Sequence, residues 1–505
     1  MPQPQSASAN PAPAGAGTGL AGHPSGLRTL FFTEMWERFS YYGMRALLVL
    51  FMTAPLTSAN PGLGFDVGKS SAIYGLYTSM VYLLSLPGGW MADRLWGQRK
   101  AVFVGGCIIA CGHFSMAVPT IGTFYLGLTL IVLGTGLLKP NVSTMVGDLY
   151  PEGGARRDAG FSIFYMGINL GASLGTALCG FIGEGYNFHW GFSLAGFGMV
   201  LGLIQYKLGA KRLGDAGKLK SDDSPEVLAR LSRNFFLIAG GVGVAVAAFT
   251  FLMVSGALDL TITQVATALG YGILILSGVF FLYLFVAGGL TSEEKRRLVV
   301  IIWLYLLVAV FWSGFEQAGS SMNIFARDLT DRNVMGWDMP ASWLQNVNPI
   351  FIVLFAPVFG WLWTWLAQRN ANPSIPMKFV LGLFGLAAGF FVLSWGSANA
   401  SETSRVSMSW LVVTYFLHTS GELCVSPVGL SSMTKLAPKG RVGQMMGVWF
   451  IGAALGNLFA GLVAGRLEEL PPSELFSNVA LYAGGFGLIA LLVSPFIKRL
   501  AGDVK

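Results

Sequence analysis

The first apolar segment of the chain carries a stripe of acids, arginines and tyrosines that could take up protons and bind a charged ligand. Its side chains are Glu34, Glu37, Arg38, Tyr41, Tyr42 and Arg45. Their spacing places them within an arc of about 140°, on one face of a helix. Charged groups in a membrane-length segment are costly, so this face should point to a protein interior or a water-filled cavity. A buried charge network that only locks helix packing is the alternative.

The composition places the chain in a lipid bilayer. Its 505 residues are 53% hydrophobic and only 11% charged, with a mean hydropathy of +0.61. Soluble domains carry about 25% charged residues. The net charge of +7 does not indicate nucleic-acid binding, because the basic residues fall in short loops between apolar spans. No metal site is expected, since the four cysteines and four histidines lack metal-ligand spacing.

Apolar runs of membrane-spanning length predict fourteen transmembrane helices. They fall near residues 28–55, 70–92, 100–119, 123–147, 158–183, 190–210, 234–256, 263–288, 298–322, 343–367, 377–397, 408–434, 442–465 and 478–498. Most of the 32 lysines and arginines lie in alternate loops, which predicts that both termini are cytoplasmic. Residues 1–27 are rich in Pro, Ala, Gly and Ser and are expected to form a disordered cytoplasmic tail.

The expected fold is an all-α integral membrane protein built from two six-helix bundles, residues 28–210 and 298–505. This is the layout of a major facilitator transporter. A charged cytoplasmic loop at 211–233 and two extra helices at 234–288 separate the bundles. Neither extra span contains a charged residue, so both helices are expected to face lipid without a role in chemistry. Two related halves would place a substrate site near the midplane between them.

The loop after the second span has glycines, an acid and basic residues at regular spacing. Gly89, Asp93, Arg94 and Gly97 resemble the cytoplasmic loop signature of the major facilitator superfamily. The resemblance implies that Asp93, with Arg94 beside it, pairs across helices and holds one state of a gate. A plain positively charged loop would explain the basic residues but not the spaced glycines.

Six motifs resemble one family of transporters. They are EMWERFSYYGMR (34–45), GTGLLKPNVSTMVGDLY (134–150), FYMGINLGA (164–172), FWSGFEQ (311–317), GELCVSPVGLSSMTKLAP (421–438) and QMMGVWF (444–450). In this order they resemble the proton-dependent oligopeptide transporters, from residue 28 to about 465. The extra helix pair is similar to that of bacterial members. Phe315 stands where some members carry a second acid, and the second helix lacks the histidine of animal members.

A transporter of short peptides must hold an ammonium and a carboxylate at a separation that changes with peptide length. Arg45 could bind the carboxylate through a bidentate fork, and Lys139 could bind it as a point charge. Glu422, helped by Asn169 and Asn348, could hold the ammonium. The resemblance assigns the same positions to these roles. Asn348 could instead cap a helix or partner the kink at the proline that follows it.

Further polar and aromatic side chains complete the expected peptide site. His418, Glu422 and Ser426 recur at helical spacing, although His418 is expected to be an interior packing residue. Five aromatic residues would form pockets for peptide side chains, namely Tyr41, Tyr42, Tyr82, Trp312 and Trp449. An interfacial or core position is the alternative for any one aromatic residue, and the family resemblance favours the pocket for these five.

Acids outnumber bases within the spans, which predicts proton coupling. The acids are Glu34, Glu37, Glu316 and Glu422, and the bases are Arg38, Arg45 and Lys139. An unpaired buried carboxylate tends to take up a proton. One candidate site is the cluster of Glu34, Glu37, Arg38 and Lys139, which face one another in the family fold. The other is Glu316, whose protonation could release a salt bridge between the halves, and the two candidates could share the titration.

These observations predict a proton-coupled symporter of di- and tripeptides in a bacterial cytoplasmic membrane. It would work by alternating access as a functional monomer, with the proton as coupling ion and no other cofactor. The alternative is a transporter of the same fold with another cargo, such as nitrate, a modified peptide or a peptide-like drug. The intact first-helix motif argues against nitrate. No filter-like loop suggests a channel, and no nucleophile with a nearby base suggests an enzyme.

Overall fold

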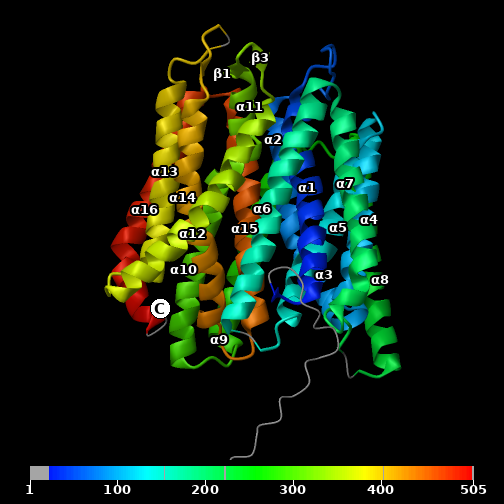
Figure 1. Cartoon of the computed structure of the whole chain (residues 1–505), viewed down its shortest axis with the longest axis vertical. Helices are drawn as coiled ribbons and strands as arrows, with labels where there is room; N and C mark the ends of the chain where they lie inside the picture. The colour runs from blue at the N-terminus through cyan, green and yellow to red at the C-terminus, as the bar shows by residue number, and fades with distance from the viewer. Residues whose placement is uncertain (1–21, 153, 221–222, 402, 503–505) are drawn as a thin grey trace, which may run out of the picture.

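The computed structural model describes residues 22–152, 154–220, 223–401 and 403–502, and Figure 1 shows that this part is built almost entirely of helices. Fourteen long helices carry the fourteen expected spans. They are α1 (Ser25–Thr53), α2 (Val67–Leu83), α4 (Gln98–Met116), α5 (Ile121–Asp148), α6 (Gly154–Gly185), α7 (Phe188–Gly209), α8 (Pro225–Val254), α9 (Ile262–Ala287), α10 (Ser292–Phe315), α12 (Val347–Gln368), α13 (Ile375–Ser397), α14 (Ser409–Leu436), α15 (Val442–Ala464) and α16 (Pro472–Ala501). Two short helices, α3 (Ser85–Met91) and α11 (Ser321–Asp328), continue α2 and α10.

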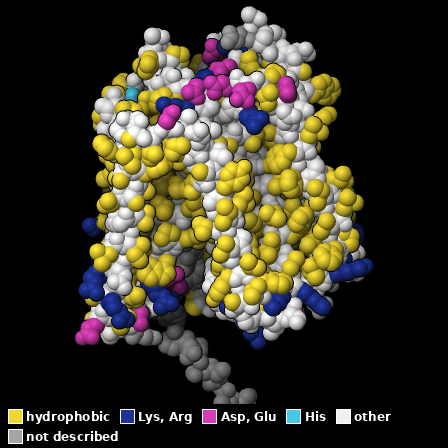
Figure 2. Space-filling model, turned by 180° about the vertical axis from the view of Figure 1, so that it is seen from behind, with side chains coloured by type: hydrophobic (Ala, Val, Ile, Leu, Met, Phe, Trp, Pro, Cys, Tyr) yellow, Lys and Arg dark blue, Asp and Glu magenta, His cyan; other side chains and the backbone are white. Residues whose placement is uncertain are grey.

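The long helices run side by side between two ends of the molecule. Ten of them are long and apolar enough to cross a membrane by length and composition alone. The first and last described residues lie at the lower end of Figure 1, whereas the loops 54–66, 184–188 and 329–346 lie at its upper end. Figure 2 shows hydrophobic side chains over the middle of one face, with Lys and Arg gathered near the lower end and most Asp and Glu near the upper end.

Two helix starts differ from the expected boundaries. α1 begins at Ser25, inside the stretch 1–27 expected to be a tail, and residues 1–21 lie outside the described residues. α8 begins at Pro225, inside the expected loop 211–233. The side chain of Ser224 accepts from the backbone N–H of Val227, and proline fits the first helical position because its missing N–H is not needed there.

Within the first half, α1 packs against α6 and α7, and α4 packs against α5 and α7. The contact of α1 with α6 depends on glycine. A Cβ atom on Gly171 would lie 2.1 Å from the carbonyl oxygen of Met35, and one on Gly175 would lie 2.1 Å from that of Phe39. Larger residues there would push α1 outward, so these glycines set the depth at which α1 carries its charged stripe.

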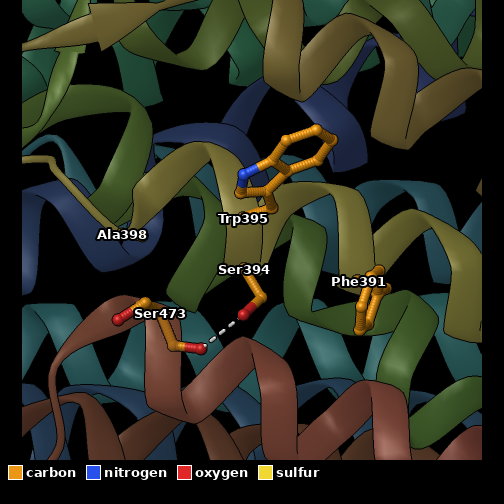
Figure 3. A pocket seen from close by; sticks show the side chains of 5 residues that line it. All are labelled: Phe391, Ser394, Trp395, Ala398 and Ser473. Carbon is orange, nitrogen blue, oxygen red and sulfur yellow. Dashed lines mark hydrogen bonds between the residues drawn. The ribbon is translucent and has the colours of Figure 1, made fainter.

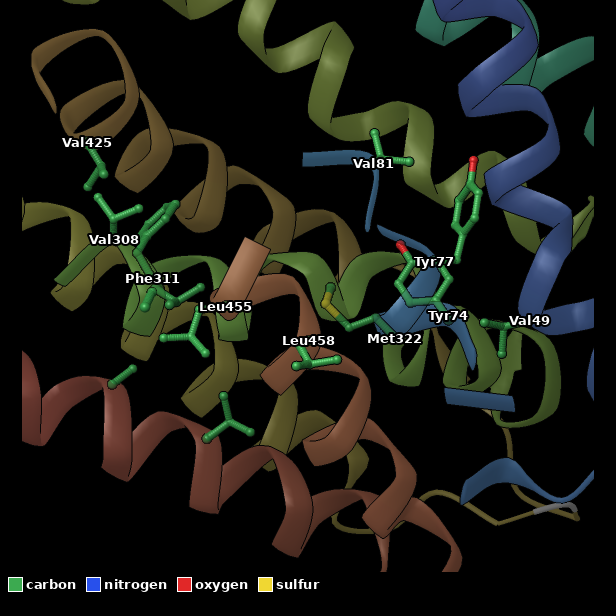
Figure 4. Close-up of a cluster of buried hydrophobic side chains, with 14 of the residues drawn as sticks. Val49, Tyr74, Tyr77, Val81, Val308, Phe311, Met322, Val425, Leu455 and Leu458 are labelled. Atoms are coloured by element: carbon green, nitrogen blue, oxygen red, sulfur yellow. The ribbon is translucent and has the colours of Figure 1, made fainter. Parts of the chain in front are cut away.

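The two halves meet mainly where α2 packs against α15 and where α6 packs against α12 and the 3-10 turn before it, η5 (Ala341–Asn346). At the first contact, a Cβ atom on Gly75 would lie 3.0 Å from Cα of Gly461. Figure 4 shows buried side chains of this region, among them Tyr74 and Tyr77 from α2 and Leu458 from α15. The core is therefore continuous from one half to the other at this contact.

The two extra helices differ in how much protein covers them. None of the apolar stretch of α8 is buried, and its contact with the first half includes Phe235 stacked on Trp90. α9 instead packs against α2 and α15, with Ala266 and Leu284 fully buried. The expectation that both helices face lipid is therefore wrong for one face of α9, because its small and aliphatic residues fit the groove between those two helices.

Two features interrupt the helices near the centre and the upper end. The expected span 298–322 breaks at Glu316, where α10 gives way to a 3-10 turn, η4 (Glu316–Gly319), before α11 begins. At the upper end, β1 (Thr330–Asp331) pairs in parallel with β4 (Val406–Ser407), and β2 (Asn333–Val334) pairs antiparallel with β3 (Trp337–Asp338). The break places a carboxylate where the regular helix ends.

Candidate functional site

The acidic end of the α1 stripe is a buried cluster in which the guanidinium of Arg38 forms ion pairs with two carboxylates, those of Glu34 and Glu37. Arg38 Nε lies 2.7 Å from Glu34 Oε1 and 2.8 Å from Glu37 Oε2. Only the contact with Glu34 has hydrogen-bond geometry, and no described residue donates a hydrogen bond to either oxygen of the fully buried Glu37. A buried carboxylate without a donor is costly, and taking up a proton removes that cost. Glu37 is thus the acid of this cluster best placed to carry a proton.

Lys139 of α5 lies near this cluster but outside ion-pair distance of any carboxylate in the described part of the chain. Its Nζ atom lies 3.8 Å from the centre of the Tyr82 ring, a cation–π contact. Glu37, Glu34 and Arg38 are close enough to act on it electrostatically. The half-buried ammonium therefore has no fixed anionic partner and remains available to one.

Arg45, near the other end of the stripe, joins the two halves. Its Nη2 atom lies 2.6 Å from Glu316 Oε2, and its Nε–H donates to the Tyr74 hydroxyl at 2.6 Å. Both charged side chains are buried. The salt bridge between halves that the sequence suggested for Glu316 is present. Arg45 is consequently engaged by Glu316 in this conformation and is not free for a ligand carboxylate.

In the second half, Asn348 of α12 binds two side chains of α14. Its Nδ2 atom donates to Thr419 Oγ1 and to Glu422 Oε2, each at 3.0 Å. Asn346 precedes the helix, so the alternative of Asn348 as a helix cap is wrong. Glu422 has no ion-pair partner among the described residues, which leaves its charge uncompensated.

The three side chains of the predicted polar stripe on α14, His418, Glu422 and Ser426, have different surroundings. His418 is buried, with Nε2 3.1 Å from the Leu386 carbonyl oxygen and its ring 4.6 Å from that of Phe390, so its interpretation as an interior packing residue is confirmed. Ser426 Oγ is buried and makes no hydrogen bond to any residue that the structure describes. Asn169 donates to the Tyr165 carbonyl of its own helix at 3.0 Å and makes no hydrogen bond to Glu422 in the structure as described.

Three of the five predicted pocket aromatics surround the charged groups. Tyr41 and Tyr42 meet edge to face at 5.3 Å, and the guanidinium of Arg45 lies 5.5 Å from the Tyr42 ring centre. Tyr82 is the ring beneath Lys139. These rings offer apolar surface next to charge, which suits non-directional contacts.

The two predicted tryptophans are packed more deeply into the second half. Trp312 contacts the rings of Phe311 and Phe315, and its buried Nε1–H finds no acceptor in the described part of the chain. Trp449 is 6% exposed and fills the space at Gly429, where a Cβ atom would lie 2.1 Å from the indole. Trp449 thus occupies a core position in this conformation.

The predicted gate pair lies at the lower end, in a π-helical segment, η2 (Ala92–Trp96), that continues α3. Asp93 and Arg94 are both exposed. Asp93 accepts a hydrogen bond from Gln98 Nε2 at 2.8 Å, within the same loop. Among the described residues it makes no ion pair across helices, so the expected gate contact is not formed here.

Polar contacts between the two halves gather at the level of Arg45 and above it. Glu184, at the end of α6, accepts from the backbone N–H groups of Ala341 and Ser342 at 2.8 and 2.9 Å. Arg327 donates to Thr53 Oγ1 at 2.6 Å. Within the described ranges, no hydrogen bond joins the halves at the lower end. These contacts therefore hold the upper end closed.

Three residues of this arrangement were missed from the sequence. Tyr74 holds Arg45, Thr419 holds Asn348, and Glu184 fastens the upper end. A signal existed for Thr419, which lies one helical turn before Glu422 on the same face. Glu184 gave no signal, because an acid at the end of a span is ordinary in sequence.

A crevice on the molecular surface does not compete with this site. Figure 3 shows it between α13 and α16, lined by Phe391, Ser394, Trp395, Ala398 and Ser473. Ser394 Oγ donates to the Ser473 carbonyl oxygen at 2.7 Å. No charged side chain lines the crevice, so it offers nothing to hold an ammonium or a carboxylate.

Comparisons with known proteins agree with this geometry. A sequence profile described as the POT family matches residues 99–478. The peptide transporter YePEPT of Yersinia enterocolitica is 40% identical over 497 residues, covering 96% of each chain. A di-/tripeptide transporter of Lactococcus lactis is 36% identical over 489 residues, covering 96% of this chain and 98% of the other.

Solved structures are similar over the same length. A crystal structure of peptide transporter POT in complex with sulfate superposes with a TM-score of 0.87 at 40% identity, covering 95% of this chain and 96% of that one. A POT family transporter in complex with 5-aminolevulinic acid gives 0.86 at 34% identity, covering 95% and 98%. These likenesses confirm the predicted fold of two six-helix bundles with two additional helices.

Proposed function

The chain belongs to the POT family, and we propose on that basis that it carries di- and tripeptides into the cell together with protons. The charges at the centre of the molecule support this function. The first half contributes Lys139 and the second half contributes Glu422. Neither side chain has an ion-pair partner among the described residues. A zwitterionic peptide placed between the halves would compensate both charges.

The uncompensated Glu422 is the single observation that carries the proposal. Its Oε2 atom accepts from Asn348, while no donor from the described residues reaches Oε1. An ammonium with three N–H groups can bind that oxygen and a neighbouring acceptor together. The peptide carboxylate would then lie toward Lys139, with Tyr42 and Tyr82 flanking the peptide and Asn169 beside its amino end.

Proton coupling in this proposal rests on two acids. Glu37 shares Arg38 with Glu34 and has no hydrogen-bond donor among the described residues in its fully buried position, so a proton there removes a charge that no hydrogen bond satisfies. Glu316 holds Arg45 across the halves, so a proton on Glu316 would release Arg45 to bind the peptide carboxylate. Protonation and peptide binding would then favour the same rearrangement, which is the condition for symport.

The proposed setting is the bacterial cytoplasmic membrane, with the lower end in the cytoplasm. The gathering of Lys and Arg near that end in Figure 2 supports this orientation. We expect a functional monomer, because one chain contains both six-helix bundles between which the candidate site lies. A membrane-impermeant thiol reagent should label an exposed Met335→Cys variant in intact cells but not a Lys439→Cys variant.

Uptake into liposomes tests the function itself. Labelled dialanine should accumulate only when the lumen is more alkaline than the outside, and unlabelled di- and tripeptides should compete. Absence of both uptake and counterflow of dialanine would refute the proposal.

A substitution at Glu422 tests whether its uncompensated charge binds the peptide ammonium. Removing one partner of a desolvated charge pair costs about 2–5 kcal/mol, so Glu422→Gln should weaken dialanine binding about 30-fold or more. The inhibition constant of N-acetyl-dialanine, which has no ammonium, should change far less. Equal losses for both peptides would mean that Glu422 supports the fold instead. Glu474→Gln, at an exposed acid of α16, is the matched control.

Another cargo with the same two charges stays a second candidate. The structural relative that holds 5-aminolevulinic acid supports it, because that ligand combines an amino group with a carboxylate. Competition of 5-aminolevulinic acid against labelled dialanine measures the relative affinity of the two ligands. Nitrate, which has no ammonium, should not compete.

A further inference from the structure

Thr419 is buried within the second half, and its hydroxyl oxygen accepts a hydrogen bond from a side chain of a different helix. It lies on α14 three residues before Glu422, and its exposed fraction is 0%. Its Oγ1 atom accepts one hydrogen bond from Asn348 Nδ2 at 3.0 Å, across the gap between α12 and α14. The same nitrogen donates to Glu422 Oε2 at 3.0 Å.

This pair of contacts determines which way the Asn348 amide faces. A primary amide has two N–H groups on one atom and a carbonyl oxygen on the opposite side. Both N–H groups are taken by α14, so the carbonyl oxygen Oδ1 must turn away from that helix. With the amide reversed, Oδ1 would lie against the Glu422 carboxylate, and two acceptors would repel each other.

The result is a preformed set of acceptors. Glu422 Oε1 and Asn348 Oδ1 receive no hydrogen bond from the described residues. The other terminal atom of each group, Glu422 Oε2 and Asn348 Nδ2, is held by a hydrogen bond. An ammonium needs two or three acceptors around it, whereas the secondary amide nitrogen of an acetylated peptide has a single N–H and needs one. Without the Thr419 hydroxyl, only Glu422 would accept a hydrogen bond from the Asn348 amide. That amide could then rotate about the Cβ–Cγ bond of Asn348.

We propose that Thr419 is a positioning residue for the peptide amino terminus, acting through Asn348. Its hydroxyl oxygen fixes the amide so that Asn348 Oδ1 and Glu422 Oε1 face the ammonium together. The proposal rests on the proposed function, since it assigns a determinant of affinity within the same site.

Binding of dialanine to the purified full-length protein, measured by calorimetry, tests this role. Thr419→Val keeps the shape but removes the acceptor, and it should weaken binding about three- to tenfold, the worth of one neutral hydrogen bond. Thr419→Ser keeps the hydroxyl and should restore binding to within about twofold of wild type.

Thr414→Val is the matched control on the same helix. Thr414 is equally buried, but its hydroxyl donates only to the backbone carbonyls of Gly389 and Trp410, at 3.1 and 2.8 Å. Its replacement removes a buried hydroxyl without touching Asn348, so dialanine binding should not change. A loss equal to that of Thr419→Val would overturn the proposal.

A double-mutant cycle separates positioning from a structural role. If Thr419 acts through Asn348, Thr419→Val should cause no further loss in an Asn348→Ala background. Additive losses would overturn the proposal, as would unchanged binding in Thr419→Val. The thermal midpoint of each variant shows whether it is folded. Failure of the wild-type protein to bind dialanine at all would instead refute the proposed function, and the role of Thr419 with it.

Discussion

Glu184→Gln should loosen the upper end of the protein and shift the resting conformation. Each oxygen of the Glu184 carboxylate accepts one backbone N–H of the other half, from Ala341 at 2.8 Å and from Ser342 at 2.9 Å. Hydrogen bonds to a charged acceptor contribute about 1.5–3 kcal/mol each, and neutral ones about 0.5–1.5 kcal/mol. Glutamine keeps one neutral acceptor and turns an NH₂ group toward the other donor.

The difference decides the expected population shift. Replacing two charged contacts by one neutral contact costs about 1.5–5.5 kcal/mol, and a value near the lower end, about 2 kcal/mol, applies because Glu184 is only half-buried. A cost of about 2 kcal/mol raises the ratio of upper-open to upper-closed molecules roughly 30-fold.

Spin labels on either side of the upper end measure this shift. The exposed residues Thr57 and Met335 belong to different halves and can be replaced by cysteine after the four native cysteines are removed. Pulsed dipolar spectroscopy in liposomes should show a larger population of long distances in Glu184→Gln than in wild type. Glu474→Gln should leave the distribution unchanged. An unaltered distribution in Glu184→Gln would refute the reasoning.

Three further predictions follow from buried contacts. Glu37→Gln should abolish uphill, proton-driven dialanine uptake while leaving counterflow measurable, and full proton-driven uptake would contradict its assignment. Leu284→Ala in α9 should lower the free energy of unfolding in detergent by about 2–4 kcal/mol, whereas Leu237→Ala in α8, which is 67% exposed, should change it by less than about 0.5 kcal/mol. Gly319→Ala would place a Cβ atom 2.0 Å from the buried Tyr74 hydroxyl and should reduce transport at least tenfold, measured as dialanine counterflow at unchanged expression.

The fold was predictable because membrane constraints are local. A helix must satisfy its own backbone in lipid, so apolar runs in the sequence predicted the fourteen long helices, and ten of these are long and apolar enough to cross a membrane by length and composition alone. The break at Glu316 was not predictable, because the apolar pattern of residues 298–322 continues through it. The packing of α9 also escaped prediction, since Leu284 next to lipid and Leu284 next to α2 or α15 look alike in sequence.

Residue types and helical spacing determined by themselves that this chain holds opposite charges inside a membrane. Glu34, Glu37 and Arg38 share a face because a helix turns by a constant angle, and no tertiary contact is needed to know it. The sequence also placed Lys139 and Glu422 in different halves.

Only the tertiary structure decided how those charges are shared. In the structure Arg45 contacts Glu316 and Tyr74, and Asn348 donates a hydrogen bond to Thr419. Glu37 has no hydrogen-bond donor among the described residues. Hydrogen bonds reach about 3 Å and depend on direction. Which of two nearby acids an arginine meets is therefore set by packing between helices that are distant in sequence, such as the close approach of α1 to α6, and no pattern within one helix contains that information.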